Sequence, residues 1–330
     1  MLSKDQEFDL SIVISSFNRD NKILQTVEQL FNSDLSGFSR IELIVIDDGS
    51  PSPVEKALAG LKTIPPVIGL RLITQKNSGI GATRNRGYRE AGSAIVIFLD
   101  DDILVEKDTI KKLYQAQQEG PGPVIFGNYP FITHASASLQ EFARQLYGYD
   151  TITREVSFQK VDAITSGLLV VNKDKLNNKD NFYKDDLTVP AAEEYELIAR
   201  FHKLGVPIYM ARHICAIHNH HLELDWLVTQ QYKYGQGAAE AFVKYPGIIG
   251  IEKFADLKAK MDAFGKNGFR NRIKTVAASR VGRKILAGYA RMVQRLSGNK
   301  KHNFLFGFLA SAYFWAGYHD GWKKFNALKT

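Results

Sequence analysis

Short runs of large apolar residues alternate with polar stretches through the first third of the chain. Nearly continuous apolar runs of this length predict strands that are buried on both faces, as in a parallel sheet. Between the first two runs, the segment 20–31 repeats apolar residues at three- and four-residue steps, which is the spacing of a helix with one buried face. Strand–helix alternation four times over predicts a doubly wound, mostly parallel α/β sheet with flanking helices. The expected strands lie near residues 10–16, 41–46, 70–74 and 95–99.

The rest of the chain is less regular and ends in a helical pattern. Strands are expected at 124–126 and 164–171, and two short extended segments at 206–211 and 213–217. From residue 222 onward the apolar spacing is helical. We therefore predict two parts, a sheet domain over residues 1–222 and a helical C-terminal region over residues 223–330. Helices are expected in that region near residues 225–245, 252–264, 269–296 and 304–328.

Carboxylates directly follow two of the apolar runs. Asp100, Asp101 and Asp102 come after the fourth run, and Asp47 and Asp48 end the second. Ligands of open α/β sheets bind at the carboxyl ends of the strands, so these groups are expected at one edge. Adjacent carboxylates raise one another's pKa unless a cation or hydrogen-bond donors lie among them. Oxygen ligands suit Mg²⁺ or Mn²⁺, and the alternative is an acidic, solvated turn.

A glycine-bearing segment opens the helix that precedes the fourth strand. Gly79 and Gly81 leave the backbone N–H groups of a helix start accessible, and such groups can bind phosphate. The spacing does not make the G-x-G-x-x-G fingerprint of dinucleotide-binding proteins. The segment thus adds a possible anion site to the same edge of the sheet.

Composition limits the class of protein. The 330 residues are enough for one large domain or for two. Cys215 is the only cysteine, which excludes an intrachain disulfide and favours a reducing, cytoplasmic location. The first residues lack the layout of a signal peptide. The longest apolar run, residues 304–318, is shorter than the roughly 20 residues that cross a bilayer, so no transmembrane helix is expected.

Positive charge is concentrated at the C-terminal end. Residues 265–330 carry 14 Lys and Arg against one acidic residue, a net +13, which leaves −5 for residues 1–264. The predicted helix 269–296 combines an apolar stripe with many basic residues, a pattern typical of a helix that lies on an anionic membrane. The run 304–318, with Trp315 and Trp322, could add apolar insertion. The alternative is a helical bundle with solvated charges. Nucleic acid is not an expected partner, because few aromatic residues interleave with the basic ones.

Four motifs, in this order and spacing, carry a resemblance to a known family. They are Ile12-Val-Ile-Ser-Ser-Phe-Asn-Arg19, Val45-Ile-Asp-Asp-Gly-Ser50, Asn77-x-Gly79 with Ala82-x-Arg84-Asn85-x-Gly87, and Phe98-Leu-Asp-Asp-Asp102. Over roughly residues 8–220 the chain resembles the family 2 glycosyltransferases of the GT-A fold. The resemblance implies inverting transfer of a sugar from a nucleotide-diphosphate sugar to a hydroxyl of a carbohydrate, lipid-linked or other acceptor. Synthesis of a polysaccharide or glycoconjugate is the expected setting.

The resemblance also implies roles for individual residues. Phe17 would lie against the base, Asp48 or Asp47 would accept hydrogen bonds from the base or ribose, and Arg84 would help to hold the nucleotide. Asp100 would reach the ribose, and Asp102 would bind Mn²⁺ or Mg²⁺, with Asp100 and His218 as further candidate ligands. The full nucleotide-binding set implied in this way is Ser16, Phe17, Asn18, Asp47, Asp48, Asn77, Arg84, Asp100 and Asp101.

An acidic pair near the start of a later helix is the candidate for the catalytic base. The helix is expected to begin near Pro190, with Glu193 and Glu194 in its first turn. Plain stabilisation of the helix dipole is the alternative role. The family usually has Glu-Asp here, with the second residue as base, which implies Glu194 despite the departure from Asp. Glu193 and Glu196 are its rivals.

Other functions remain open at this point. A sugar nucleotidyltransferase would share the sheet and the metal carboxylates, but it usually has a Gly-rich basic loop where this chain has Ser15-Ser16-Phe17-Asn18. A phosphatase of the haloacid-dehalogenase type usually carries its Asp-x-Asp on the first strand, whereas here the motif follows the fourth. The Glu-Glu pair also leaves open a nucleotide-sugar-binding protein without catalysis. Zinc at residues 218–221 is not expected, since a zinc site needs about four ligands.

Overall fold

The computed structural model describes residues 8–132, 135, 137–147, 153, 155–177, 181–263, 275–296 and 303–328. The chain forms two compact units. The first contains Met1–Phe131, Thr151–Asp186 and Phe201–Asn219, and the second contains Ile132–Asp150, Leu187–Arg200 and His220–Thr330. Part of the expected helix 269–296, up to residue 274, lies outside the described residues.

The first unit is built on a mixed sheet with the strand order β3-β2-β1-β4-β9-β6-β10-β5. Strand β1 pairs in parallel with β2 and with β4, and β2 pairs in parallel with β3. Two further strands, β7 and β8, pair with β10. The bounds are β1 Leu10–Ser16, β2 Ile41–Asp47, β3 Ile68–Thr74, β4 Ile95–Asp100, β5 Ile103–Val105, β6 Val124–Asn128, β7 Phe131–Ile132, β8 Phe158–Val161, β9 Leu168–Asn172 and β10 Ile208–His221.

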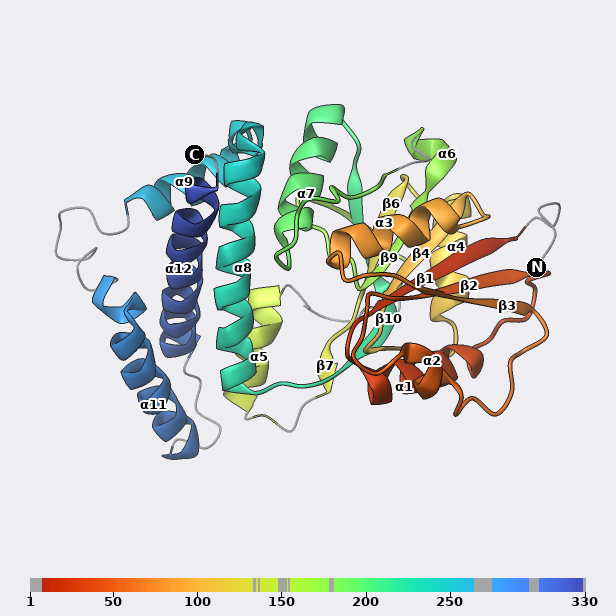
Figure 1. Cartoon of the computed structure of the whole chain (residues 1–330), viewed down its shortest axis with the longest axis horizontal. Coiled ribbons are helices and arrows are strands. Elements are labelled where there is room, and N and C mark those ends of the chain that lie inside the picture. Colours follow the sequence, from red (N-terminus) through yellow and green to blue (C-terminus); the bar gives the residue numbers. More distant parts are fainter. Residues whose placement is uncertain are drawn as a thin grey trace. The chain divides into compact units, whose positions relative to one another are not determined.

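Helices cover this sheet on both faces. Figure 1 shows α3 on one face and α1 and α2 on the other. A Cβ at Gly87 of α3 would collide with the side chain of Val13, so this glycine allows α3 to lie close to β1. The sequence-based prediction of a mostly parallel α/β sheet with flanking helices is confirmed. The helices of this unit are α1 Asp20–Phe31, α2 Val54–Leu58, α3 Ile80–Glu90, α4 Thr109–Glu119 and α6 Lys173–Leu176.

Two strands differ from the sequence-based prediction. Strand β9 begins at Leu168, and it lies antiparallel between β4 and β6. Its residues are as buried as those of a parallel strand, so their apolar run gives no sign of direction. The two short segments expected at 206–217 form one strand, β10, whose pairing shifts register between Met210 and Cys215. Arg212 and His213 lie at this bulge. Their polar side chains interrupt the apolar pattern, so the sequence suggests two separate strands.

The second unit is helical. Its closest helix pair is α8 with α12, where Cβ atoms at Gly235 and Gly317 would collide with the carbonyl oxygens of Phe314 and Tyr232. Figure 1 shows α12 between α8 and α11. The bounds are α5 Ala137–Tyr147, α7 Ala192–Leu204 (of which the residues up to Arg200 belong to this unit), α8 Leu224–Lys244, a 3₁₀ helix Pro246–Gly250, α9 Glu252–Asp262, α11 Arg280–Leu296 and α12 Asn303–Ala327.

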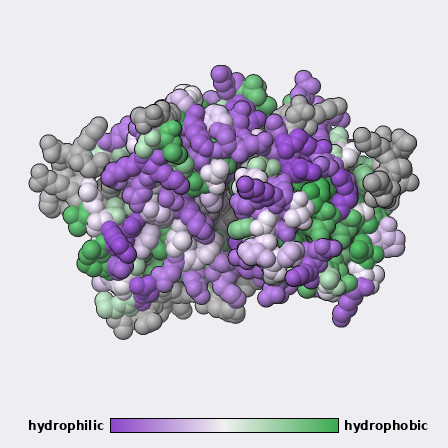
Figure 2. Space-filling model, viewed as in Figure 1, coloured by the Kyte–Doolittle hydropathy of each residue, from purple (hydrophilic) through white to green (hydrophobic). Residues whose placement is uncertain are grey.

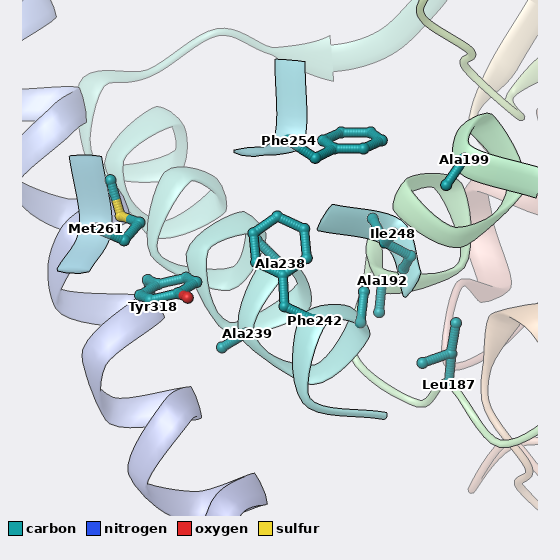
Figure 3. Close-up of a cluster of buried hydrophobic side chains, with 11 residues drawn as sticks. Leu187, Ala192, Ala199, Ala238, Ala239, Phe242, Ile248, Phe254, Met261 and Tyr318 are labelled. Carbon is teal, nitrogen blue, oxygen red and sulfur yellow. The ribbon is translucent and has the colours of Figure 1, made fainter. Parts of the chain in front are cut away.

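A cluster of buried apolar side chains forms the core of this unit (Figure 3). The ring of Phe242 meets those of Phe254 and Tyr318 edge to face, with centroids 6.1 and 6.2 Å apart. Aromatic pairs favour this geometry. The buried side of α12 also includes Leu309 and Ala312. Most of the run 304–318 is therefore buried or partly buried inside the unit, as the helical-bundle alternative predicts, and apolar insertion into a membrane stays a prediction. No helix of the described residues is long and apolar enough to cross a bilayer.

Candidate active site

The carboxylates that end β2 are buried and bound by donors from the following loops. Asp47 accepts hydrogen bonds from the backbone N–H of Ser50 at 2.8 Å and of Val54 at 3.0 Å, so it fixes the turn into α2. Asp48 accepts from the backbone N–H of Ser78 at 2.9 Å and of Gly79 at 3.0 Å. Asp48 therefore ties the end of β2 to the start of α3. Both residues stand at the predicted edge, and their contacts with a base or ribose remain a prediction.

The segment after β1 presents more accessible side chains at the same edge. Phe17 is 47% exposed, which is unusual for a phenylalanine that follows a buried strand. Asn18 has a left-handed backbone with φ of 55°, and its N–H donates to the Ser50 hydroxyl at 2.9 Å. Asn77, before the start of α3, is exposed. These three residues are open to a ligand, whereas Asp47 and Asp48 support the loops behind them.

An ion pair joins α3 to the end of β4. Arg84 donates from Nη2 to Oδ1 of Asp100 at 2.6 Å, and its guanidinium lies 5.6 Å from the ring centre of Tyr183. A Cβ at Gly167 would lie 2.9 Å from Oδ2 of Asp100, so a side chain there would displace this carboxylate. Asn85 holds the backbone of Tyr183 through two hydrogen bonds of 2.7 Å. Arg84 and Asn85 of the third motif thus position Asp100 and the backbone of Tyr183.

Asp101 points into the protein. Its carboxylate accepts from the hydroxyl of Ser16 at 2.6 Å, and its carbonyl accepts from Thr26 at 2.9 Å. Burial raises the pKa of Asp101 to about 7, and the neighbouring charge of Asp102 also raises it. The hydrogen bond from Ser16 has the opposite effect and lowers this pKa. Asp101 therefore links the ends of β1 and β4, and Ser16 is occupied by this contact.

Asp102 lies close to two cationic side chains and to a histidine. Strand β5 pairs with β10 so that His218 lies opposite Ile103, and Nε2 of His218 is 3.3 Å from Oδ1 of Asp102. Oδ2 of Asp102 is 3.6 Å from Nη1 of Arg19 and 3.7 Å from Nζ of Lys22. Burial opposes ionisation, but the hydrogen bond from His218 and the nearby positive charges bring the pKa of Asp102 down to about 2. The carboxylate is thus ionised at neutral pH.

The donors at this edge could supply part of the coordination shell of a divalent cation. The carboxylate of Asp102 suits Mn²⁺ or Mg²⁺, His218 lies beside it, and Mg²⁺ sites often use one or two carboxylates together with phosphates and water. Asp100 is paired with Arg84. Within the described ranges, no group of three or more His, Cys, Asp and Glu residues is arranged as a metal site. Asp102 and His218 thus offer at most part of a metal's ligands, and their metal role stays a prediction.

The predicted catalytic pair lies in the second unit, at the start of α7. This helix begins at Ala192, two residues after Pro190, and Ala191 before it has a left-handed backbone with φ of 69°. Glu193 is buried, whereas Glu194 is partly exposed. Glu196 is also buried, and Arg200 donates to its carboxylate at 3.0 Å. Of the three acids, Glu194 is thus the most accessible.

A buried carboxylate on α8 holds the segment that precedes α7. Glu240 is fully buried and accepts from the backbone N–H of Thr188 at 3.0 Å and of Val189 at 2.8 Å. It also accepts from Lys244 at 2.9 Å. A Cβ at Gly237 would collide with the carbonyl oxygen of Pro190, so α8 also touches this segment directly. These contacts fix the approach of the chain to Glu193 and Glu194.

Comparison with known proteins gives the family of this chain. The family model described as glycosyl transferase family 2 matches residues 11–177, just over half of the chain, and this span includes all four motifs. The chain belongs to glycosyl transferase family 2. The family match covers β1 to β9 and leaves out both α7 and the C-terminal helices.

Curated relatives agree with this family assignment but cover only part of the chain. The minor teichoic acid biosynthesis protein GgaA of Bacillus subtilis is 29% identical over 32% of this chain and 24% of its own length. An uncharacterised glycosyltransferase of Haemophilus influenzae is 27% identical over 50% of this chain and 49% of its own. The chain thus spans less than half of the length of these relatives.

A solved structure supports the fold over most of the chain. The mannosyltransferase PcManGT from Pyrobaculum calidifontis, in complex with GDP-Man and Mn²⁺, matches with a TM-score of 0.54. The match covers 94% of this chain and 87% of the other, at 14% identity. At this identity the likeness establishes the GT-A fold alone.

The family motifs did not reveal every residue of the site. Sequence reasoning missed Arg19 and Lys22 as partners of Asp102, although Arg19 ends the first motif and Lys22 follows it by three residues in α1. That spacing places both on one side of the helix start and could have suggested a shared partner. Tyr183 and Glu240 gave no comparable signal, because their roles depend on contacts with distant parts of the chain.

Proposed function

We propose that this chain is an inverting glycosyltransferase that moves a sugar from a nucleotide-diphosphate sugar to a hydroxyl of an acceptor. The observation that carries the proposal is the arrangement of Asp100 and Asp102 at the end of β4, within the span that matches the family. Asp100 is oriented by Arg84, and Asp102 is ionised beside His218. Accessible Phe17 and Asn77 at the same edge leave room for a base and ribose.

The donor is proposed to bind along this edge of the sheet. Phe17 offers a ring face to the base, and Asp100 offers a carboxylate oxygen to the ribose hydroxyls. Arg84 fixes the direction of Asp100 and contributes positive charge near the nucleotide. Asp102 and His218 would hold Mn²⁺ or Mg²⁺, which supplies positive charge for the diphosphate when it is bound.

Glu194 is proposed as the general base. It would accept the proton of the acceptor hydroxyl while the hydroxyl oxygen bonds to the anomeric carbon, and the bond from that carbon to the diphosphate oxygen breaks. The products are the glycosylated acceptor, the nucleotide diphosphate and a proton on Glu194, which passes to solvent. The fixed approach to α7 favours this role, because a base must stay within hydrogen-bond reach of its substrate.

The cytoplasm is the proposed setting. The single cysteine, Cys215, is buried and unpaired, which suits a reducing compartment. The basic C-terminal region favours an anionic membrane face, where a lipid-linked acceptor would be within reach, and free carbohydrate is the other acceptor class. The family of relatives that includes GgaA supports glycan or glycoconjugate synthesis as the process.

The proposal is tested by incubating the purified chain with Mn²⁺ and single nucleotide sugars, then measuring the nucleotide released. Release of nucleoside diphosphate from at least one donor, abolished by EDTA, is the expected result. Release of pyrophosphate from a nucleoside triphosphate and a sugar phosphate would instead identify a nucleotidyltransferase. Donor binding without turnover, with any acceptor tried, would identify a nucleotide-sugar-binding protein, which the Glu193-Glu194 pair leaves as the alternative.

A further inference from the structure

Helix α11 exposes four of its larger apolar side chains. Val281, Ile285, Tyr289 and Met292 are 67%, 66%, 52% and 48% exposed, respectively. Their steps of four, four and three residues place them in one stripe along the helix. In Figure 2, hydrophobic side chains are visible on the surface over α11, at the left of the view. A continuous exposed stripe of this kind usually marks an interaction surface.

The opposite side of α11 holds the helix in its unit with small residues. Ala287 and Ala290 are buried, and the guanidinium of Arg283 lies over the rings of Tyr232 and Tyr313, at 5.1 and 5.3 Å. Four large apolar side chains thus face outward while two alanines are buried, an exposure that packing of α11 within its unit does not require. The stripe is therefore available to a partner without any rearrangement of α11.

Basic residues run beside this stripe. Arg280 and Lys284 precede Val281 and Ile285 by one position each, which puts them about a quarter of a turn away along the same edge. Neither Arg280 nor Lys284 forms an ion pair with any residue that the structure describes. Arg291, in the same row, pairs with Asp225 at 2.6 Å. Residues 265–330 as a whole carry a net charge of +13.

We propose that the α11 stripe is the surface by which this chain attaches to an anionic lipid bilayer. An amphipathic helix with apolar residues on one face and Lys and Arg beside them lies in the plane of such a membrane. The apolar side chains enter the boundary between headgroups and acyl chains, and Arg280 and Lys284 meet the headgroup phosphates. The proposal deepens the membrane setting of the proposed function, but its test does not depend on catalysis.

Two other occupants fit the stripe less well. A second copy related by a two-fold axis would bring the same basic row twice into one interface, and like charges would repel. Nucleic acid would satisfy the basic residues but leave the four apolar side chains against a polar backbone. An anionic lipid bilayer can contact both the apolar side chains of the stripe and the basic residues beside them.

The test is flotation of the purified full-length chain with vesicles. One set of vesicles contains phosphatidylcholine alone, and the other contains phosphatidylcholine with phosphatidylglycerol. We expect recovery with the anionic vesicles, little recovery with the neutral ones, and weaker binding as salt rises, because exposed charges are screened. Equal recovery with both vesicles, or no recovery with either, would overturn the proposal.

Two pairs of substitutions assign the binding to α11. Arg280→Gln with Lys284→Gln should lower the partition coefficient about 30-fold, which corresponds to about 1 kcal/mol per basic residue. Ile285→Ser with Met292→Ser should lower it at least about 10-fold through loss of apolar contact. Matched controls in the first unit are Lys62→Gln with Lys107→Gln and Val156→Ser with Leu204→Ser, all exposed positions.

The control variants determine whether α11 itself makes the attachment. Controls that bind like the unmodified chain support the proposal, and controls that lose as much binding as the α11 variants overturn it. A chain that sediments as a dimer, and as a monomer after Ile285→Ser with Met292→Ser, would assign the stripe to self-association instead. Nucleotide release measured without vesicles should be unchanged in all four variants, so a failed attachment and a failed enzyme assay are distinguishable.

Discussion

The two units of this chain present their functional groups in different ways. In the first unit, the candidate residues follow strands directly in sequence, so the sheet brings them together at one edge. In the second unit, Glu193 and Glu194 stand on a helix start that is fixed by α8, a helix that begins 30 residues later. The first arrangement depends on strand order, whereas the second depends on contacts between distant segments. The difference predicts that substitutions in the first unit affect mainly the donor and those at α7 mainly the transfer step.

The largest effect is expected at Glu194. Replacing it with Gln keeps the shape and the hydrogen bonds but removes the base, so turnover should fall about 10²-fold or more while donor binding is retained. Steady-state kinetics and calorimetry with the donor measure the two quantities. Glu196→Gln is the matched control, because Arg200 already occupies the carboxylate of Glu196. If Glu193→Gln is inactive and Glu194→Gln is active, the base is Glu193. If both variants are active, the base is a different residue.

A similarly large effect is expected when the proposed metal is removed. Asp102→Asn, or EDTA with the unmodified chain, should weaken binding of the nucleotide diphosphate about 10²-fold, as loss of a principal metal ligand does. Calorimetry in Mn²⁺ measures this. Asp108→Asn, at an acid that precedes α4 and has a half-exposed side chain, is the control and should bind normally. If neither EDTA nor the substitution changes the affinity for the nucleotide diphosphate, the metal role of Asp102 is refuted.

A smaller effect, on stability, tests the packing of the second unit. A Cβ at Gly317 would collide with the carbonyl oxygen of Tyr232, so Gly317→Ala must push α12 away from α8. We expect a loss of about 2 kcal/mol in the free energy of unfolding, measured by denaturant titration. Gly288→Ala is the control: its Cβ meets nothing within 4 Å, and alanine there should stabilise α11 by roughly 0.5–1 kcal/mol. Equal responses of the two variants would contradict the close packing.

The smallest effect is expected at Phe17. Since nearly half of this side chain is exposed, Phe17→Ala should leave the free energy of unfolding almost unchanged. Loss of stacking on a base is expected to cost about 1 kcal/mol, which is roughly a fivefold weaker donor affinity. Phe304→Ala, at an aromatic that is 88% exposed in the second unit, is the control. An unchanged donor affinity after Phe17→Ala would remove Phe17 from the nucleotide-binding set.

Much of the first unit could be predicted from the sequence because its signals are local. A buried strand and the carboxylates after it are adjacent residues, and parallel strands end at the same edge. The direction of β9 could not be predicted in this way, since a buried strand looks alike in either direction. The positive charges around Asp102 were also missed, because they depend on how α1 meets the end of β4.

The second unit was predictable in outline only. Helical spacing revealed four C-terminal helices, but it could not distinguish an apolar residue that packs inside from one that faces solvent. Leu309 and Ile285 look alike in sequence, yet Leu309 is buried and Ile285 is exposed. The segments 132–150 and 187–200 also group with the C-terminal helices, and nothing in their composition indicates this.

The two glycines of α8 have a consequence for the motions of the second unit. Gly235 lies against α12, and Gly237, on nearly the opposite side of the helix, lies against the segment before α7. A helix enclosed by backbone on two sides can open its hydrogen bonds only when both neighbours withdraw. The amides in the middle of α8 should therefore be among the last in this unit to exchange with deuterium. Because Glu240 binds the N–H groups of Thr188 and Val189, those two amides should exchange almost as slowly. The start of α7 would then be slow-moving on the timescale of turnover, although it follows an irregular loop.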